Sequence, residues 1–337
     1  MPSEALTVDQ LDEKALLARI FPLLGPDTSL LGPGDDAAVI ASPDGRTAIS
    51  IDTLVQDADF RLLWPCGYRT AGYDVGWKCV VQNVADIWAM GAVPTSLVVS
   101  LTLPGSTEVA WVEDLAAGLA GCISFLGLGR CSVVGGDLGR GNQIVVTAAV
   151  TGDLQGREPV QRSGARPGDI LAHAGALGLA AGGLSVLESD AVDMPDPATA
   201  GDHLLGVLAM AQLRPRPPRT GSGPAAAAAG ATAMLDVSDG LVRDAGRIAR
   251  ASAVSIDLDA AYLATRAELL APAAARLGAD PLDWVLGGGE DHGLLATFPP
   301  DAGLPQGFLR IGEVHDGAGV TFGRAVPPVT GWDHFAG

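Results

Sequence analysis

The first chemical signal in the chain is a pair of adjacent carboxylates, Asp35 and Asp36, which follow a glycine turn and precede an alternating apolar run. Two carboxylates about 4 Å apart repel each other by roughly 4 kcal/mol at an effective dielectric near 20, so a folded site needs protons, basic partners or a metal ion beside them. No lysine or arginine lies near this pair in sequence. A metal ion is the expected partner.

Acidic residues beside glycine or serine recur at the predicted ends of later strands. The further turns of this kind are Asp52-Thr53, Asn83-Val84-Ala85-Asp86, Gly135-Gly136-Asp137, Asp236-Val237-Ser238-Asp239-Gly240 and Gly287-Gly288-Gly289-Glu290-Asp291. Mg²⁺ prefers oxygen ligands and takes one or two carboxylates per ion together with phosphate oxygens. These dispersed aspartates therefore predict one phosphate site that holds more than one Mg²⁺ ion. Taken alone, Ser238 or Asp239 could equally be a helix cap and nothing more.

The common motifs of phosphate binding and nucleophilic catalysis are absent from the sequence. There is no GxxxxGK[ST] loop, no GxGxxG opening a helix after a strand, no kinase signature set, no GxSxG elbow and no HExxH helix. A nucleotide-binding protein without a Walker lysine must neutralise the phosphates by other means, and several aspartates holding Mg²⁺ would do so.

Composition describes a globular chain with room for two cores. Its 337 residues are 48% hydrophobic, and the net charge of −18 argues against nucleic acid or an anionic membrane as a partner. The cysteines form no CxxC pair, which favours reduced core thiols and the cytoplasm; they are Cys66, Cys79, Cys122 and Cys131. The start of the chain is acidic where a signal peptide would be basic, so export is not expected.

The elements that must position these residues follow from periodicity. In the first half we expect a helix over 8–21, a hairpin of strands 37–41 and 47–51, and a helix over 68–90. The hairpin would bring Asp35, Asp36 and Asp52 to one end of the strand pair. A strand over 95–103, a helix over 107–126 and strands over 131–134 and 143–150 complete a β-β-α-β-α-β-β order, an α+β domain of about 150 residues.

A glycine, proline and arginine-rich stretch at 152–168 predicts the domain boundary, giving domains 1–152 and 153–337. The second half repeats the same kind of units. Strands are expected at 169–173, 232–235, 254–258, 292–298, 307–314 and 319–322, and helices at 177–188, 241–252 and 267–277. The segment 214–223 is either a mobile surface loop or a lid over an anionic ligand. Asp257 and Asp259 alternate on a strand and are expected to be solvated.

Taken in order, the motifs resemble those of the thiamine-monophosphate kinases over nearly the whole chain. Besides the acidic turns above, the resemblance rests on Gly34-Asp35-Asp36-Ala37-Ala38, Met90-Gly91-Ala92, Arg162-Ser163-Gly164-Ala165-Arg166-Pro167-Gly168-Asp169 and Trp332-Asp333-His334-Phe335. It implies a two-domain α+β fold like that of aminoimidazole ribonucleotide synthetase. In that fold the N-terminal domain forms a β-barrel across the two-fold axis of a homodimer, and the C-terminal domain is an α/β sandwich.

The same resemblance implies roles for individual residues. The implied Mg²⁺ ligands are Asp36, Ser50, Ile51 through its carbonyl, Asp52, Asp86, Asp137, Asp236 and Asp239. ATP would contact Gly136, Asp137, Arg162 and Ser238, and thiamine monophosphate would contact Asp59, Glu290 and Trp332. Asp86, Asp137 and Asp239 would be the catalytic carboxylates. The N-terminal domain would bind ATP and Mg²⁺ and form the dimer, and the C-terminal domain would complete the site.

Two positions depart from the family pattern. Asp59-Phe60 stands where the family usually has His-Phe, and that histidine meets the substrate. An aspartate there could still serve through the thiazolium charge, a metal ion or water. His292 stands where the family often has tyrosine, and either strand packing or a role behind the site is open for it.

The activity implied is direct in-line transfer of the ATP γ-phosphoryl group to the phosphate of thiamine monophosphate, which gives thiamine diphosphate. The acceptor is already an oxyanion, so no strong general base is needed, and Mg²⁺ with orientation would bring the two polyanions together. One alternative is an ATP-dependent sibling enzyme of the same fold with another small phosphorylated acceptor. The other is a non-catalytic regulator that binds Mg-nucleotide.

Overall fold

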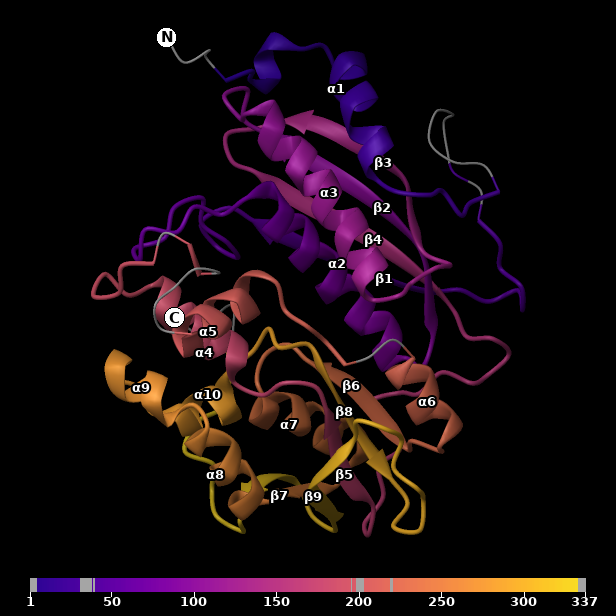
Figure 1. The fold of residues 1–337 in the computed structure, drawn as a ribbon. Coiled ribbons are helices and arrows are strands. Elements are labelled where there is room, and N and C mark those ends of the chain that lie inside the picture. The colour runs from indigo at the N-terminus through magenta and orange to yellow at the C-terminus, as the bar shows by residue number, and fades with distance from the viewer. Residues whose placement is uncertain are drawn as a thin grey trace. The chain divides into compact units, whose positions relative to one another are not determined.

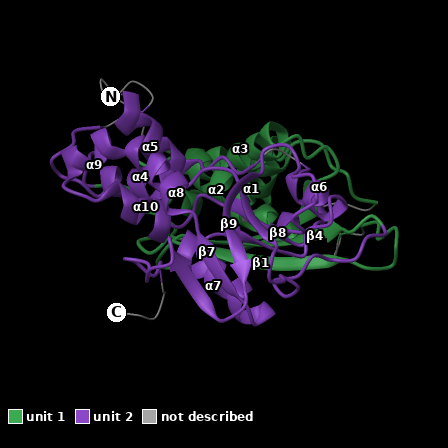
Figure 2. Cartoon of the chain, turned by 90° about the horizontal axis from the view of Figure 1, so that it is seen from below, with its two compact units in different colours: residues 1–64, 69–87, 94–155 green, residues 65–68, 88–93, 156–337 purple. Residues whose placement is uncertain are grey.

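The computed structural model describes residues 5–30, 38, 40–194, 196–197, 203–218 and 221–332 (Figure 1). The chain forms two compact units, each with its own sheet (Figure 2). Unit 1 comprises residues 1–64, 69–87 and 94–155, and unit 2 comprises residues 65–68, 88–93 and 156–337. Among the described residues no helix has the length and hydrophobicity needed to cross a membrane.

Unit 1 is built on a four-stranded sheet in the order β1-β4-β2-β3. Its strands are β1 (Ala48–Val55), β4 (Val145–Asp153), β2 (Val93–Leu103) and β3 (Ser132–Arg140). Strands β1 and β4 are antiparallel, whereas β2 and β3 are parallel. Consequently β1 and β3, which carry several of the predicted ligands, form the two edges of the sheet.

Side chains of β1 alternate between the two faces of this sheet. Leu54 is buried, whereas Ile49 is 72% exposed and Ile51 is 64% exposed. Because successive side chains in a strand point to opposite faces, Ser50 and Asp52 share the face of Leu54. Figure 1 shows helices α2 (Gly72–Ala89) and α3 (Val109–Phe125) lying together across the sheet. One face of the sheet therefore exposes large apolar side chains.

Unit 2 is built on a six-stranded mixed sheet in the order β10-β7-β9-β5-β8-β6. The strands are β5 (Ile170–Ala174), β6 (Ala233–Val237), β7 (Ser255–Leu258), β8 (Gly293–Phe298), β9 (Leu309–His315) and β10 (Gly319–Phe322). Helix α7 (Leu241–Ser252) follows β6 directly. Its packing face is apolar and buried, with Leu241, Ala245 and Ile248 fully inside the core. The remaining helices are α4 (Leu179–Leu187), α5 (His203–Leu213), α6 (Ser222–Ala228), α8 (Ala260–Glu268), α9 (Ala271–Leu277) and α10 (Pro281–Gly287).

Several predicted elements differ from those observed. The helix expected over 8–21 is a 3₁₀ turn, Val8–Gln10, followed by α1 (Glu13–Ile20) and a second 3₁₀ turn, Phe21–Leu23. Leu11 is extended, and Asp12 starts a new helix by accepting a hydrogen bond from the Ala15 N–H at 2.7 Å. The helix expected over 267–277 is likewise two helices, α8 and α9. Pro272 lacks an N–H and therefore suits the first turn of α9 rather than a helix interior.

Other predictions fall partly outside the described residues. The strand expected over 37–41 is one of them, and Ala38, Ile40 and Ala41 are not in a strand. The segment 214–223 ends in α6, which begins at Ser222. Helices α5, α6 and α10 were not predicted, and α8 shares only its last two residues with the helix predicted over 267–277. The α5 sequence is apolar on most sides and therefore lacks the polar stripe that marks an amphipathic helix.

Candidate active site

In unit 2 the predicted ligands lie where β6 ends and α7 begins, in a segment that we call the carboxylate turn, residues 236–240. Strand β6 delivers the buried Asp236, and Ser238 and Asp239 follow before Gly240, the N-cap of α7. Neither Ser238 nor Asp239 caps the helix with its side chain, because the N-cap residue is Gly240 and makes no side-chain cap. The simple reading of Ser238 or Asp239 as a cap is therefore wrong.

The glycine-rich segment 287–292 packs directly against the carboxylate turn. The Glu290 N–H donates to the Ser238 carbonyl at 2.9 Å, and the His292 N–H donates to the Val237 carbonyl at 3.1 Å. A Cβ on Gly289 would lie 2.1 Å from the Ser238 carbonyl oxygen, so only glycine permits this approach. The arrangement holds Glu290 beside Ser238 and Asp239.

The end of the described chain joins the same place. The Trp332 N–H donates to the Asp239 carbonyl at 2.8 Å, while the Trp332 residue is 61% exposed. An exposed indole anchored through its backbone can offer a flat apolar surface to a ligand. Unit 2 thus brings together five predicted site residues from three distant segments: Asp236, Ser238, Asp239, Glu290 and Trp332.

His292 pairs with the carboxylate turn through its side chain. Its Nδ1 lies 3.2 Å from Oδ2 of Asp236, and both residues are buried. Of the two roles left open for His292, the contact with Asp236 places it behind a predicted ligand.

Asp244, on α7, stabilises the carboxylate turn from inside. This fully buried carboxylate accepts the N–H groups of Ser238 at 3.1 Å and Asp239 at 3.0 Å. Burial raises the pKa of Asp244 to about 7, although the N–H of Asp239 and the charge of Arg247 favour its ionised form. Arg247 Nη1 donates to Asp244 at 2.5 Å, and Arg247 Nη2 donates to Asp239.

Sequence reasoning missed Asp244 and Arg247. Asp239, Arg243 and Arg247 recur every four residues, the spacing at which side chains on a helix face one another. One aspartate followed by two arginines at this spacing was the available signal. This spacing points to a contact between Asp239 and the arginines only once the carboxylate turn is known to lie beside the face of α7 that carries Arg243 and Arg247.

The neighbours of Glu290 are also fixed by buried groups. Gln212 on α5 is buried, and its Nε2 donates to Glu290 Oε2. Asp291 accepts the N–H groups of Gly178 at 2.5 Å and Ala180 at 2.9 Å, which ties the segment to the start of α4. Burial raises the pKa of Asp291 to about 6, although these two hydrogen bonds favour its ionised form. Glu290 is thus held between the carboxylate turn and two helices.

In unit 1, Ser50 and Asp86 come together from β1 and α2. The Ser50 hydroxyl donates to Asp86 Oδ2 at 2.5 Å. Asp52 lies two residues further along the same face of β1, while the Ile51 side chain faces the other way, which leaves only the carbonyl of Ile51 for a ligand role. Asp36 lies outside the described residues.

Gly136 and Asp137 lie on β3, at the opposite edge of the sheet from β1. Asp137 pairs with Ser100 on β2, and three strand spacings separate β3 from β1, about 14 Å along the sheet. A Cβ on Gly136 would lie 2.1 Å from the Val99 carbonyl oxygen, so the ladder requires glycine there. Within one copy of unit 1, Asp137 is therefore not adjacent to Asp52.

Asp59, the charge-reversed position, has a local partner. Its Oδ2 accepts the Val55 N–H at 2.7 Å, and its carbonyl accepts a hydrogen bond from Lys78 Nζ at 3.2 Å. The side chain thus closes the turn after β1, a task that a carboxylate performs well. Asp257 and Asp259 also have local roles: Asp257 accepts from Thr321 and the Arg324 N–H, and Asp259 caps α8. Asp259 is exposed, as expected of a solvated residue, and Asp257 is half-buried.

Arg162 lies apart from the carboxylate turn. The neighbouring Gln161 carbonyl accepts the Met234 N–H, and the Arg162 carbonyl accepts the Ser252 hydroxyl at 3.3 Å. Met234 lies in β6 and Ser238 follows its last residue, Val237; four extended residues span about 13 Å. The Arg162 side chain is exposed and long, and only by extending could it span the distance from its own backbone to Ser238.

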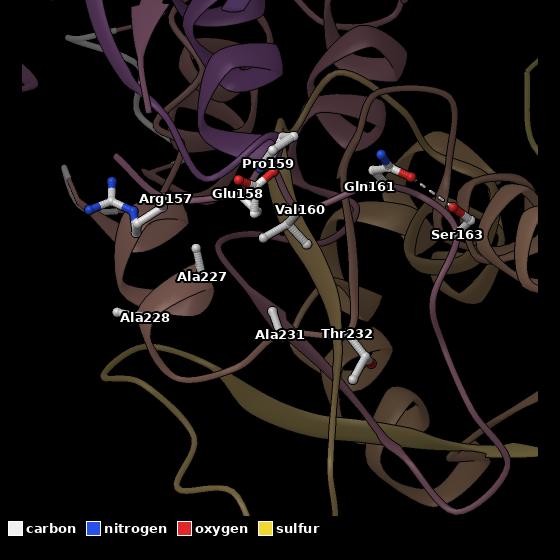
Figure 3. Close-up of a pocket in the computed structure, with 10 residues that line it drawn as sticks. All are labelled: Arg157, Glu158, Pro159, Val160, Gln161, Ser163, Ala227, Ala228, Ala231 and Thr232. Carbon is white, nitrogen blue, oxygen red and sulfur yellow. Dashed lines mark hydrogen bonds between the residues drawn. The ribbon is translucent and has the colours of Figure 1, made fainter. Parts of the chain in front are cut away.

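A shallow pocket of about 590 Å³ adjoins the Arg162 segment (Figure 3). Its lining residues are Arg157, Glu158, Pro159, Val160, Gln161, Ser163, Ala227, Ala228, Ala231 and Thr232. Figure 3 shows Gln161 hydrogen-bonded to Ser163 at one side and Arg157 at the other. None of the predicted ligands lines this pocket.

The donor set fits Mg²⁺ in its chemistry. Every predicted ligand offers a carboxylate, hydroxyl or carbonyl oxygen, the ligand type that Mg²⁺ prefers. Across the described ranges, no group of three or more His, Cys, Asp or Glu side chains is close enough to hold a metal ion. Among the described donors, Ser50 and Asp86 contact each other directly.

Comparison with known proteins places the chain in a family. Residues 34–154 match "AIR synthase related protein, N-terminal domain", and residues 166–321 match the corresponding C-terminal domain. These matches, with the structural neighbours below, confirm the two-domain α+β fold that the motifs predicted.

Relatives and solved structures extend the similarity over nearly the full length. The thiamine-monophosphate kinase of Mycobacterium tuberculosis is 43% identical over 338 residues, covering 99% of this chain and 95% of the relative. The crystal structure of the Stenotrophomonas maltophilia enzyme of that name has a TM-score of 0.75 at 31% identity, covering 94% of this chain and 98% of the other. A structure described as "AaThiL complexed with AMPPCP and TMP" has a TM-score of 0.72 at 29% identity, covering 99% of this chain and 100% of the other. The chain therefore belongs to the thiamine-monophosphate kinase family.

Proposed function

We propose that this protein transfers the γ-phosphoryl group of ATP to thiamine monophosphate and so forms thiamine diphosphate. The observation that carries the proposal is the convergence of Asp236, Ser238, Asp239, Glu290 and Trp332 in one place of unit 2. Full-length relatives bear the name of this activity, and one structural relative was solved with AMPPCP and TMP.

Mg²⁺ would be held by the oxygen donors that the family resemblance implies, which are Asp36, Ser50, the Ile51 carbonyl, Asp52, Asp86, Asp137, Asp236 and Asp239. Mg²⁺ supplies charge neutralisation for phosphate groups that would otherwise repel each other and the aspartates. Asp86, Asp137 and Asp239 would be the catalytic carboxylates because they hold these ions where the reacting phosphates meet.

The remaining residues bind and orient the two substrates. Gly136, Ser238 and Arg162 would contact ATP, the last through its long side chain. Glu290, held by Gln212, and the exposed face of Trp332 would contact thiamine monophosphate. Asp59 would reach the substrate only if its hydrogen bond with the Val55 N–H exchanges. In-line transfer between oriented phosphates needs no covalent intermediate.

A homodimer would complete this arrangement. Ile49, Ile51 and Val98 are exposed on the open face of the unit 1 sheet, where a second copy would bury them. If two four-stranded sheets closed into a barrel, β1 of one copy would meet β3 of its partner. Asp137 would then lie near Asp52 of the other copy, which removes the 14 Å separation within one sheet.

We assign ATP, Mg²⁺ and dimer contacts to residues 1–152 and completion of the site to residues 153–337. The buried free cysteines are consistent with the cytoplasm.

The direct experiment measures thiamine diphosphate formed by the purified protein from thiamine monophosphate, ATP and Mg²⁺. Product that disappears with EDTA and in the Asp86→Asn variant supports the proposal and shows that Asp59 is tolerated. Binding of Mg-ATP without product would overturn it in favour of another phosphorylated acceptor or a regulatory role.

A further inference from the structure

We propose that Arg247 is an exchangeable counter-ion for Asp239, occupying this carboxylate in the metal-free protein and giving it up when a divalent cation binds. The inference rests on the proposed function, in which Asp239 is a Mg²⁺ ligand. It adds a residue, Arg247, that would tune how tightly the site holds metal.

Arg247 already occupies one of the two carboxylate oxygens that Asp239 could offer to a cation. Its Nη2 donates to Asp239 Oδ2, and Arg243 Nε lies 4.0 Å from the same oxygen. A carboxylate oxygen engaged by a guanidinium has lost the most favourable direction for a second cation. Metal binding at Asp239 through Oδ2 therefore competes with Arg247.

Asp244 keeps Arg247 in position when Arg247 releases Asp239. Arg247 Nη1 donates to Asp244 Oδ1 at 2.5 Å, while Nη2 faces Asp239. The planar guanidinium can hold one carboxylate with one nitrogen and release the other. Because Asp244 also accepts the Ser238 and Asp239 N–H groups, the turn backbone stays fixed during this exchange.

The counter-ion also explains how the metal-free turn tolerates its own acidity. Asp236 and Asp239 lie in the carboxylate turn, and Asp244 lies in the first turn of α7. Carboxylates gathered in this way repel each other unless cations stand between them. Arg247 supplies that cation before metal arrives, so the site need not be assembled by metal.

The test compares the Arg247→Gln variant with wild type. Glutamine can still donate to Asp244 but carries no charge for Asp239. Without nucleotide, we expect Mg²⁺ and Mn²⁺ to bind about tenfold more tightly to this variant, because one charge-assisted hydrogen bond no longer competes. Calorimetry with Mg²⁺ and electron paramagnetic resonance with Mn²⁺ measure this directly. The melting temperature should rise more on Mg²⁺ addition in the variant than in wild type.

Arg250→Gln is the matched control, since Arg250 is an exposed residue on the same helix and its loss removes the same charge. Arg247→Lys keeps a charge but cannot donate to two carboxylates at once as the guanidinium does. Its affinity for Mg²⁺ should lie between those of wild type and Arg247→Gln. If Arg247→Gln does not fold, this lysine variant carries the comparison.

Three results would overturn the exchange. They are equal metal affinity in Arg247→Gln and wild type, weaker affinity in the variant, and a Mg²⁺-bound structure in which Arg247 still contacts Asp239. If wild type makes thiamine diphosphate while any of these holds, the inference fails and the proposed function stands. If wild type neither binds metal nor makes product, both fail.

Discussion

The imidazole Nδ1 of His292 lies 3.2 Å from Oδ2 of Asp236, and the two side chains are buried together behind the carboxylate turn. His292 also donates its backbone N–H to Val237, so it binds both the side chain and the backbone of the strand end. A predicted metal ligand is thereby oriented by a residue at which this chain departs from the family pattern.

Removal of this imidazole should weaken both stability and metal binding. In His292→Ala, Asp236 would be left buried without its partner, so we expect a loss of about 2 kcal/mol in the free energy of unfolding and about tenfold weaker Mg²⁺ binding. His292→Asn should recover much of both, because its amide can donate from nearly the position of Nδ1 and asparagine tolerates the left-handed backbone at φ +50°. Urea unfolding and calorimetry measure the two effects. Equal behaviour of the two variants would contradict the role.

Gly289 should tolerate no side chain. In Gly289→Ala the added Cβ would lie 2.1 Å from the Ser238 carbonyl oxygen, which also accepts the Glu290 N–H. The forced shift should lower kcat/KM by about 100-fold, the cost of misplacing a binding group by roughly 1 Å. Gly303→Ala is the control, since nothing lies within 4 Å of its added Cβ. Steady-state kinetics that fail to separate the two variants would count against the packing argument.

Trp332 should matter for the substrate and not for the fold. Since Trp332 is 61% exposed, Trp332→Ala should leave the melting temperature unchanged. Loss of a flat apolar surface should raise KM for thiamine monophosphate by about tenfold, with kcat little altered. Val326→Ala, at a residue 89% exposed, removes apolar surface nearby in sequence and should change neither quantity. A KM that stays at the wild-type value would exclude Trp332 from the substrate site.

His173 should make the protein acid-sensitive. Burial, with a smaller effect of the Arg266 charge, lowers the pKa of His173 from 6.5 to about 3. Below pH 6.5 the unfolded chain therefore binds a proton here that the folded chain does not, so stability is complete above that pH and is lost as the pH falls towards 3. Near pH 4.5 the loss is about 3 kcal/mol.

His173→Leu tests this pH dependence. The variant should lose about 3 kcal/mol less than wild type between neutral pH and about pH 4.5, as measured by urea unfolding. His315→Leu is the control, because His315 is half exposed. The same acid dependence in all three proteins would show that other groups dominate.

The local pattern of aspartate and glycine predicted which residues lie where a strand ends, because both residue types favour the turns that follow strands. Asp236, Ser238 and Asp239 were expected at the end of a strand, and β6 ends at Val237. Their contact with Glu290 and Trp332, which lie far along the chain, followed only from resemblance to a family. Periodicity carries no information about which segments pack together.

The residues that sequence reasoning missed act across the fold. Gln212 reaches Glu290 from a helix that showed no polar stripe, and Asp244 looked like an ordinary helix residue. For Asp59, sequence reasoning emphasised a role in substrate binding and missed a structural one. Its charge reversal drew attention to substrate chemistry, whereas its carboxylate closes a turn by accepting the Val55 N–H.

Strand β1 carries the predicted ligand side chains Ser50 and Asp52 on one face and the exposed side chains of Ile49, Ile51 and Thr53 on the other. Side-chain direction in a strand depends only on parity. Deletion or insertion of one residue within 48–52 would therefore exchange the two faces, turning the carboxylate outward and an isoleucine towards α2. Natural variation in this strand should consequently appear as substitutions that keep its length, while changes of length collect in the loops on either side.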